Sequence, residues 1–242
     1  MKRVLFLGAS GLIGPYLIPG LVDHYDLRLG DVKSVAPGSP VSGVVEHIDV
    51  RDYDQVLEAA RGCEAIMNFT VVRNDPVGSF QVNTIGAWNV MRAAVALGIQ
   101  KIVHSGPQAV RSTYDTDFDV EDAPAAPGTG HYGISKWLSA EICRVFSQKH
   151  DLQTVYFVFN GLGPAPEPCT EPKDTPPFVV VWEDLQQACR LALEVPEVPD
   201  NFQLFNLLSY SGPGKYNTNK AQRLLGFEPA QDWDELFLRV AG

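Results

Sequence analysis

An apolar segment near the start of the chain, residues 3–7, runs directly into three glycines spaced three residues apart, Gly8, Gly11 and Gly14. A helix-like segment follows them. In this order, Gly8 allows a sharp turn, Gly11 lets the backbone approach a pyrophosphate, and Gly14 lets the helix pack close to the strand. The N-terminus of the helix then faces the phosphate charge. The pattern predicts a dinucleotide-binding turn, whose other candidate contacts are Ser10, Leu12 and Ile13.

The surroundings of the glycines strengthen this prediction, because a glycine triplet alone is also common in ordinary tight turns. Asp31 lies 17 residues after Gly14, at the end of a second apolar segment. A carboxylate at that place can accept hydrogen bonds from both hydroxyls of an adenosine ribose, and it would repel a 2′-phosphate. The residues therefore favour NAD over NADP. An ordinary turn and a surface acid are the alternatives, and Lys33 keeps NADP open.

Strand-like and helix-like segments alternate along the 242 residues, of which 45% are hydrophobic. Such alternation indicates a parallel sheet covered on both faces. We predict an α/β fold: a doubly wound Rossmann sheet over 1–160, with a small C-terminal substrate-binding lobe over 161–242 packed on it as one structural domain. Pro19 should kink or shorten the first helix. The expected strands are about 3–7, 26–30, 44–48, 65–69, 101–104, 152–159 and 203–207, and the expected helices about 12–22, 53–61, 81–97, 132–149, 183–194 and 217–225.

The charge pattern argues against several classes of partner. The formal net charge is -10 and the sequence pI is about 4.9. No basic run occurs, so neither nucleic acid nor an anionic membrane surface is expected as a partner. The four cysteines have no metal-type spacing and are typical of reduced thiols. No apolar stretch approaches the roughly 20 residues of a membrane span. We expect a cytoplasmic protein with a small-molecule substrate and no metal.

A second motif supplies groups for proton transfer. Tyr132 and Lys136 are four residues apart in a long helical pattern, so they share one face of the helix. A phenol has a reference pKa of about 10, and a neighbouring ammonium favours the phenolate. Such a pair can exchange a proton with a hydroxyl or carbonyl while hydride moves to or from a nicotinamide. A Tyr-x-x-x-Lys match is common by chance, but here it accompanies the dinucleotide motif.

These motifs together resemble those of the extended short-chain dehydrogenases/reductases, the NAD-dependent epimerase/dehydratase family. The resemblance implies a Rossmann core that binds NAD, Tyr132 as the acid/base, and Lys136 on the nicotinamide ribose. It also implies a homodimer formed through the helices near 82–97 and 132–149. The short C-terminal part resembles that of uronate dehydrogenases, which oxidise a free sugar acid with NAD. The matching pieces are Gly8-x-x-Gly11-x-x-Gly14, Asp31, Asp49-Val50, 83–89, Tyr132-x-x-x-Lys136, 160–164 and 220–229.

Further residues are expected to border the cofactor by their position. Asp49 follows the third strand, where its carboxylate could reach the adenine amino group, and Val50 stands beside it. Asn68 and Thr70 lie where the chain leaves the fourth strand, and Thr70 is placed to border the nicotinamide. Asn83 opens the 83–89 motif and is a cofactor contact by resemblance.

Two positions depart from the family pattern. The family places a catalytic Ser or Thr after the fifth strand, and that position is Pro107 here. Ser105, two residues earlier, is the nearest hydroxyl and our third catalytic candidate. The alternatives are that Gln108 or a water substitutes, or that Ser105 only caps the strand end. The Arg common before the Asn-x-x-Gly-Pro motif is replaced by Phe157.

Three basic or titratable residues near the expected site have uncertain roles. The Arg expected to hold a substrate carboxylate in a uronate dehydrogenase is missing, and Lys173 is close to that place but not aligned. Arg73 follows the fourth strand and could meet an anionic substrate, although we favour a solvated loop arginine. His104 could be a second acid/base of the kind that epimerases need, although we favour a satisfied strand-end histidine.

Three functions remain open. The first is an NAD-dependent dehydrogenase that acts on a hydroxyl of a small sugar or sugar acid. The second is a nucleotide-sugar epimerase or dehydratase that recycles NAD within one turnover. The third is a non-catalytic NAD-binding protein, which Pro107 supports but intact Tyr132 and Lys136 oppose. A diphosphate-linked sugar is normally bound by basic side chains that contact its phosphates. The C-terminal part has few basic residues, so the sequence favours the first function.

Overall fold

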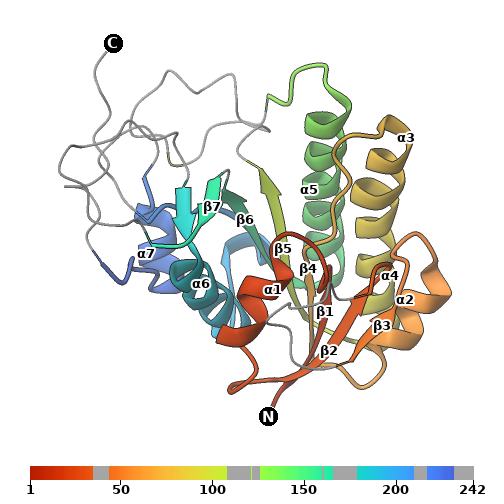
Figure 1. Ribbon diagram of the computed structural model, residues 1–242, viewed down its shortest axis with the longest axis horizontal. Coiled ribbons are helices and arrows are strands. Elements are labelled where there is room, and N and C mark those ends of the chain that lie inside the picture. The colour runs from red at the N-terminus through yellow and green to blue at the C-terminus, as the bar shows by residue number, and fades with distance from the viewer. Residues whose placement is uncertain are drawn as a thin grey trace.

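The central sheet contains seven strands, and every neighbouring pair in it is parallel (Figure 1). The computed structural model describes residues 1–34, 44–107, 121, 126–159, 161–165, 179–209 and 217–231. The order across the sheet is β3-β2-β1-β4-β5-β6-β9, so β2 and β3 are added on one side of β1 and the later strands, from β4 on, are added on the other side. The strands are β1 (Arg3–Leu7), β2 (Asp26–Asp31), β3 (Val45–His47), β4 (Ala65–Asn68), β5 (Lys101–Pro107), β6 (Gln153–Phe159) and β9 (Phe202–Asn206). This is the predicted Rossmann-type sheet.

Strand β1 shows why the sheet is buried on both faces. Val4, Leu5, Phe6 and Leu7 are all fully buried. Because successive side chains of a strand point to opposite faces, Val4 and Phe6 belong to one hydrophobic cluster and Leu5 and Leu7 to another. A sheet with helices on only one face would leave half of these side chains in water, so the unbroken apolar run requires two helical layers.

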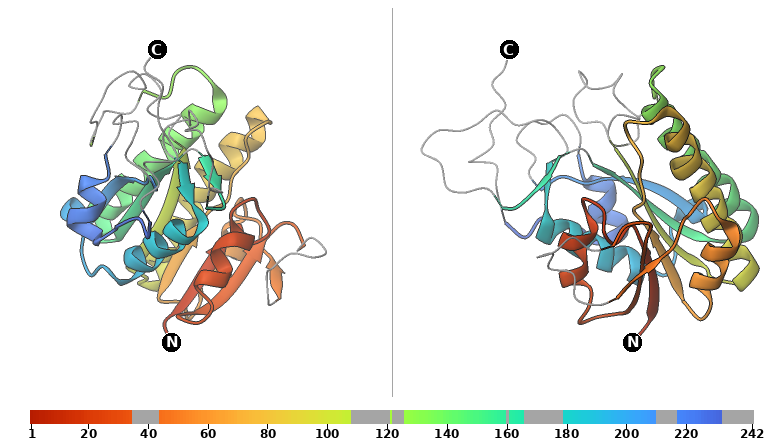
Figure 2. Two further views of the ribbon diagram at one scale, coloured as in Figure 1. Left: turned by 60° about the vertical axis from the view of Figure 1, so that its left-hand side comes forward. Right: turned by 45° about the vertical axis from the view of Figure 1, so that its right-hand side comes forward.

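The two helical layers lie on opposite faces of the sheet. The first cluster contains side chains of α1, α6 and α7, and the second contains side chains of α2, α4 and α5. Figures 1 and 2 show α4 and α5 side by side in one layer and α1 against α6 in the other. The helices are α1 (Gly14–Leu17), α2 (Tyr53–Ala60), α3 (Pro76–Gly78), α4 (Ala87–Leu97), α5 (His131–His150), α6 (Trp182–Glu194) and α7 (Asn219–Leu225).

Two expected helices differ from their predicted form. The segment predicted as a helix over 12–22 contains one α-helical turn, α1, followed by a 3₁₀ turn, η1 (Ile18–Gly20). Pro19 lacks the backbone N–H that would continue the helix, so the predicted shortening is confirmed. The segment predicted as one helix over 81–97 begins instead as a π-helix, η2 (Ser79–Gly86), and continues as α4. Apolar spacing does not separate these two helix types.

The C-terminal part adds a strand to the main sheet. β9 pairs in parallel with β6, and Phe205 of β9 is fully buried in the first cluster. A pair of strands that the sequence did not predict, β7 (Gly161–Gly163) and β8 (Val179–Val181), precedes α6, and a 3₁₀ turn, η4 (Pro199–Asn201), precedes β9. The boundary at residue 160 between core and lobe stays a prediction. Among the described residues, no helix has the length and apolar character needed to cross a membrane.

Candidate active site

The glycine-rich turn joins β1 to α1 at the carboxyl edge of the sheet. Gly8 has φ +94°, and a Cβ there would lie 2.8 Å from the backbone carbon of Phe69 in the chain leaving β4. A Cβ on Gly14 would lie 2.3 Å from the carbonyl oxygen of Ala9. Both positions therefore require glycine, as predicted. Gly11 and Leu12 are exposed at the tip of the turn, which leaves the backbone there open to a ligand.

Asp31 ends β2 beside this turn. Its carboxylate accepts hydrogen bonds from the backbone N–H of Ser10 and of Lys33, both at 3.0 Å. The Ser10 hydroxyl is buried and has no hydrogen-bond partner among the residues that the structure describes. An orphaned hydroxyl costs free energy, and a pyrophosphate oxygen would satisfy it. The orphaned hydroxyl, the open loop backbone and the carboxylate at the strand end therefore fit the phosphates and adenosine ribose of a dinucleotide. Because α1 is a single turn, its dipole can add little.

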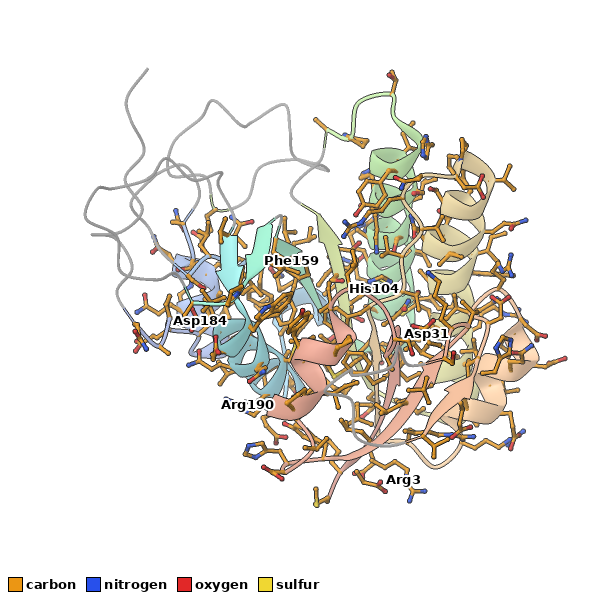
Figure 3. All side chains as sticks on the ribbon, in the orientation of Figure 1. Arg3, Asp31, His104, Phe159, Asp184 and Arg190 are labelled. Carbon is orange, nitrogen blue, oxygen red and sulfur yellow. The ribbon has the colours of Figure 1, made fainter. Side chains whose placement is uncertain are left out.

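A cavity of about 110 Å³ lies where the chain leaves β4, β5 and β6. Its described lining brings together all three predicted catalytic residues with the end of the glycine turn. Figure 3 shows Phe159 at this carboxyl end of β6, with Arg3 at the opposite, amino end of the sheet. The described lining residues are Ile13, Phe69, Val71, Arg73, Ser105, Gly106, Tyr132, Lys136, Phe159 and Leu162.

Lys136 is held at the bottom of this site, where only 3% of the residue is exposed. Its Nζ donates to the carbonyl oxygen of Ser105 at 2.9 Å and to that of Thr70 at 3.5 Å. Burial disfavours the charged ammonium and lowers the pKa of Lys136 to about 7. The two carbonyls therefore fix the Lys136 side chain between β4 and β5.

Tyr132 stands one turn earlier on α5, which begins at His131. Burial raises the pKa of the Tyr132 phenol, and the positive charge of Arg73 opposes that shift. The Arg73 guanidinium carbon lies 5.8 Å from the centre of the Tyr132 ring. We expected an ammonium to favour the phenolate, but the nearby cation that lowers the pKa of Tyr132 is this guanidinium.

Asn83 fixes the backbone around Tyr132. Its amide oxygen accepts from Val72 N–H at 3.0 Å, and its Nδ2 donates to the Val72 carbonyl at 2.9 Å. The same Nδ2 donates to Ser135 Oγ at 3.0 Å, and Ser135 Oγ in turn donates to the Tyr132 carbonyl at 3.0 Å. Both amide hydrogens of Asn83 are thus used on protein partners. The contact between Asn83 and a cofactor stays a prediction, whereas its positioning role is visible.

Ser105 and its neighbours differ in their access to the cavity. Ser105 lines the cavity although it is only 5% exposed, and its role as the catalytic hydroxyl stays a prediction. His104 is fully buried, stacks on Tyr156 at 5.0 Å, and lies with Nε2 3.2 Å from both Asn68 Nδ2 and Ser139 Oγ. Burial lowers its pKa well below the ordinary value. His104 is therefore a neutral packing residue.

The remaining predicted contacts lie on two strand ends. Asp49, after β3, is ion-paired with Arg51, whose guanidinium holds the pKa of the Asp49 carboxyl below its usual range. Val50 is buried and its carbonyl accepts from Asn89. Asn68 ends β4, and its amide oxygen accepts from both the N–H and the hydroxyl of Thr70. Their contacts with a cofactor stay predictions.

Of the other positions named from the sequence, one lies in the core and the rest lie outside the described residues. Phe157, where the family has Arg, is fully buried in β6 and belongs to the first hydrophobic cluster. The side chain of Pro107, and all of Gln108, Asn160 and Lys173, lie outside the described residues.

Most of the apolar lining was not predicted from the sequence, and the role of Arg73 was left open. Val71, Phe159 and Leu162 follow strand ends, and the carboxyl ends of parallel strands meet at one edge of a sheet. That rule could have selected them. Arg73 is an exposed loop residue that also lines the cavity, so the structure does not decide between the two roles considered for it. Its carbonyl is 2.9 Å from His131 Nε2, which must donate because a carbonyl only accepts.

Comparisons with known proteins agree with this architecture. The model of the NAD dependent epimerase/dehydratase family matches residues 4–178. An L-arabinose 1-dehydrogenase (NAD(P)(+)) of Haloferax volcanii is 23% identical, over 95% of this chain and 96% of that protein. A UDP-glucose 4-epimerase of Azospirillum brasilense is 29% identical, over 67% of this chain and 51% of that protein.

Among solved structures, a uronate dehydrogenase from Agrobacterium tumefaciens has the same fold, with a TM-score of 0.75 and 22% identity. The match covers 96% of this chain and 85% of the uronate dehydrogenase. The family model spans the glycine turn, the Tyr132–Lys136 pair and the strands that carry them, and it supports the predicted NAD cofactor. The chain therefore belongs to the NAD-dependent epimerase/dehydratase family.

Proposed function

We propose that this protein is an NAD-dependent oxidoreductase that acts on a hydroxyl of a small sugar or sugar acid, with Tyr132 as the acid/base. The observation that carries the proposal is the meeting of Tyr132, Lys136 and Ser105 in one cavity with Ile13 of the glycine turn. A cofactor on that turn and a substrate beside Tyr132 would share this cavity. A protein that only binds NAD has no need of the pair.

The residues suited to hold NAD come from the turn and from β2. The open backbone at Gly11 and the Ser10 hydroxyl would hold the pyrophosphate, and Asp31 would accept from the adenosine ribose. When bound, NAD supplies the acceptor for a hydride. We expect Lys136 to hydrogen-bond the nicotinamide ribose, although its ammonium contacts two carbonyls here.

The protein's part in the reaction is proton transfer and positioning. The substrate carbon loses hydrogen with its electron pair, the hydroxyl proton moves to the Tyr132 phenolate, and the hydroxyl becomes a carbonyl. Ser105 would hydrogen-bond the same oxygen. Asn83 and Ser135 keep the first turn of α5 in place, which fixes the phenol relative to the cavity. The apolar lining of Phe69, Val71 and Phe159 limits water at the reacting atoms.

A nucleotide-sugar epimerase or dehydratase is the second candidate, because a UDP-glucose 4-epimerase is among the relatives. The chain spans only 51% of that protein's length. Both reactions use the same proton transfer, but a dehydrogenase releases NADH whereas an epimerase recycles it.

The deciding experiment follows absorbance of NADH with purified protein, NAD, and a panel of free aldoses and uronic acids, with NADP in parallel. We expect NADH to accumulate with one class of sugar and with NAD. If NAD binds but no sugar yields NADH, the dehydrogenase proposal fails. Conversion of a UDP-sugar without net NADH would then identify the epimerase, and no conversion would identify a binding protein.

We also infer a homodimer, formed through α4 and α5. These helices pack side by side, and their neighbourhood exposes apolar side chains that a partner copy would cover: Ile85 is 46% exposed, Trp88 43% and Val145 53%. Sedimentation at micromolar concentration checks this, with Trp88→Glu expected to give monomers. The cytoplasmic location and the absence of nucleic-acid or membrane partners stay predictions.

A further inference from the structure

Arg73 differs from the other described arginines in its surroundings. Six of them make ion pairs, with Asp26, Glu46, Asp49, Glu58, Glu141 and Glu121 as the acids. Arg190 donates to the Gly20 carbonyl, and Arg92 lies over the rings of Tyr53 and Trp88. Arg73 makes no ion pair with any residue that the structure describes, and it lines the cavity.

The backbone of Arg73 is held in place although its side chain has no acidic partner. His131 of α5 contacts the Arg73 carbonyl at 2.9 Å, and the preceding residue, Val72, is held by Asn83 through both its N–H and its carbonyl. The guanidinium is therefore presented from a fixed backbone.

The cavity has an unbalanced positive charge at Arg73. Its described lining contains two cations and no acid. The ammonium of Lys136 is buried and directed at the carbonyls of Ser105 and Thr70, so the guanidinium of Arg73 is the cation that remains available to a substrate. The whole chain carries a net charge of -10, which repels anions. An anionic substrate would therefore need such a dedicated cation.

We propose that Arg73 binds an anionic group of the substrate, so that the enzyme prefers sugars bearing a carboxylate or a phosphate to neutral sugars. This inference rests on the proposed function. The guanidinium carbon is 5.8 Å from the centre of the Tyr132 ring, and the Arg73 side chain interacts with the Tyr132 phenol, so a sugar that reaches one of these groups also reaches the other. A hydroxyl of the sugar then meets the phenol while the anionic group meets the fork of N–H donors.

Two matched sugar series test the proposal. D-glucose, D-glucuronate and D-glucose 6-phosphate differ only at carbon 6, as do D-galactose, D-galacturonate and D-galactose 6-phosphate. Binding to the NAD-loaded protein is measured by calorimetry, and NADH formation is measured in parallel. We expect an anionic member to bind more tightly than its neutral counterpart in the wild type. Preference for the uronate or for the phosphate distinguishes the two sources of negative charge.

Arg73→Gln should remove this preference by weakening the anionic sugar about 10- to 150-fold, with little change for the neutral sugar. Arg73→Lys keeps the positive charge but loses the planar set of guanidinium N–H donors. Its loss of affinity for the anionic sugar should therefore be intermediate. Arg61→Gln is the matched control, because Arg61 is an exposed residue paired with Glu58 near the end of α2. It makes the same change in net charge away from the cavity.

Three results would overturn the proposal: no preference of the wild type for any anionic sugar, no binding in either series, or an equal loss for neutral and anionic sugars in Arg73→Gln. An equal loss would mean that Arg73 acts on Tyr132 or on the fold. A failure of the proposed function looks different. Anionic sugars would bind in an Arg73-dependent way, but no NADH would form.

Discussion

The glycine turn and the catalytic cavity differ in how their residues are brought together. The turn is built from residues 8–14 and Asp31, and the contacts that shape it are between backbone atoms or from backbone N–H to one carboxylate. The cavity collects side chains from the chain leaving β4, from β5, from α5 and from the end of β6. Damage to the turn should therefore affect folding and cofactor binding, whereas damage to the cavity should affect chemistry.

The largest expected effect lies in the cavity. Tyr132→Phe removes the group that accepts the proton, and general acid–base catalysis is worth about 10²- to 10⁴-fold. We expect kcat to fall by that factor while the Kd for NAD changes less than about twofold, since the phenol is not part of the turn. Steady-state kinetics and calorimetry measure the two quantities. Unchanged kcat would remove Tyr132 from the mechanism.

A substitution in the glycine turn should instead lower the stability of the folded protein. A Cβ at position 14 would lie 2.3 Å from the Ala9 carbonyl oxygen, so the backbone must shift. We expect Gly14→Ala to cost about 3 kcal/mol, which lowers Tm by roughly 6–12 °C in a chain of this size. Thermal unfolding followed by circular dichroism measures this.

Gly163→Ala serves as the control for the turn, because a Cβ at Gly163 meets no atom of a described residue within 4 Å. Its Tm should stay close to that of the wild type. Equal Tm values for Gly14→Ala and Gly163→Ala would show that the close packing at α1 is not needed.

The same contrast explains what the sequence could predict. The glycine turn is encoded in seven consecutive residues, and each glycine's role follows from local geometry, so Gly8 and Gly14 were identified correctly. Tyr132 and Lys136 are also local, because four residues make one helical turn. The alternation of apolar segments likewise predicted both helical layers of the sheet. These features depend on neighbours in the chain.

Features that depend on distant segments were missed or left open. Arg73 becomes part of the site only because β4 and α5 place it beside Tyr132. The direction of the Lys136 ammonium follows from carbonyls on two other segments, not from its spacing to Tyr132. The π-helix η2 directly precedes α4, and the sequence predicted one helix through this part of the chain. Tertiary contacts decide all three, and a single sequence does not display them.

Asp31 offers a test of the turn's chemistry with a smaller expected effect. Its carboxylate should favour NAD by bonding the ribose and by repelling a 2′-phosphate. We expect Asp31→Asn to reduce the ratio of kcat/KM for NAD to that for NADP by about 10-fold, the value of one charge-assisted hydrogen bond. Asp26→Asn is the control, because Asp26 begins the same strand at the other edge of the sheet and pairs with Arg3. A ratio that moves equally in both variants would exclude a specific role for Asp31.

The last effect we expect concerns the folding stability of the protein as pH changes. Burial lowers the pKa of Lys136 from 10.5 to about 7, so between these values the unfolded chain binds one proton more than the folded chain. Folding stability therefore rises with pH in that window, by at most roughly 1.4 kcal/mol per pH unit. Lys136→Met removes this contribution. The free energy of unfolding of the wild type, relative to that of the variant, should therefore increase as pH rises from 7 to 9, and urea unfolding measures it.

The comparison with Lys149→Met decides whether the burial of Lys136 causes the pH dependence of stability. Lys149 is exposed in the last turn of the same helix, so the difference between wild type and Lys149→Met should stay constant over the same pH range. If Lys136→Met also gives a constant difference, the ammonium keeps its ordinary pKa in the folded protein and solvent must reach it. The cavity would then be wetter than its apolar lining indicates, and its separation of the reacting atoms from water would have to come from the bound cofactor and substrate.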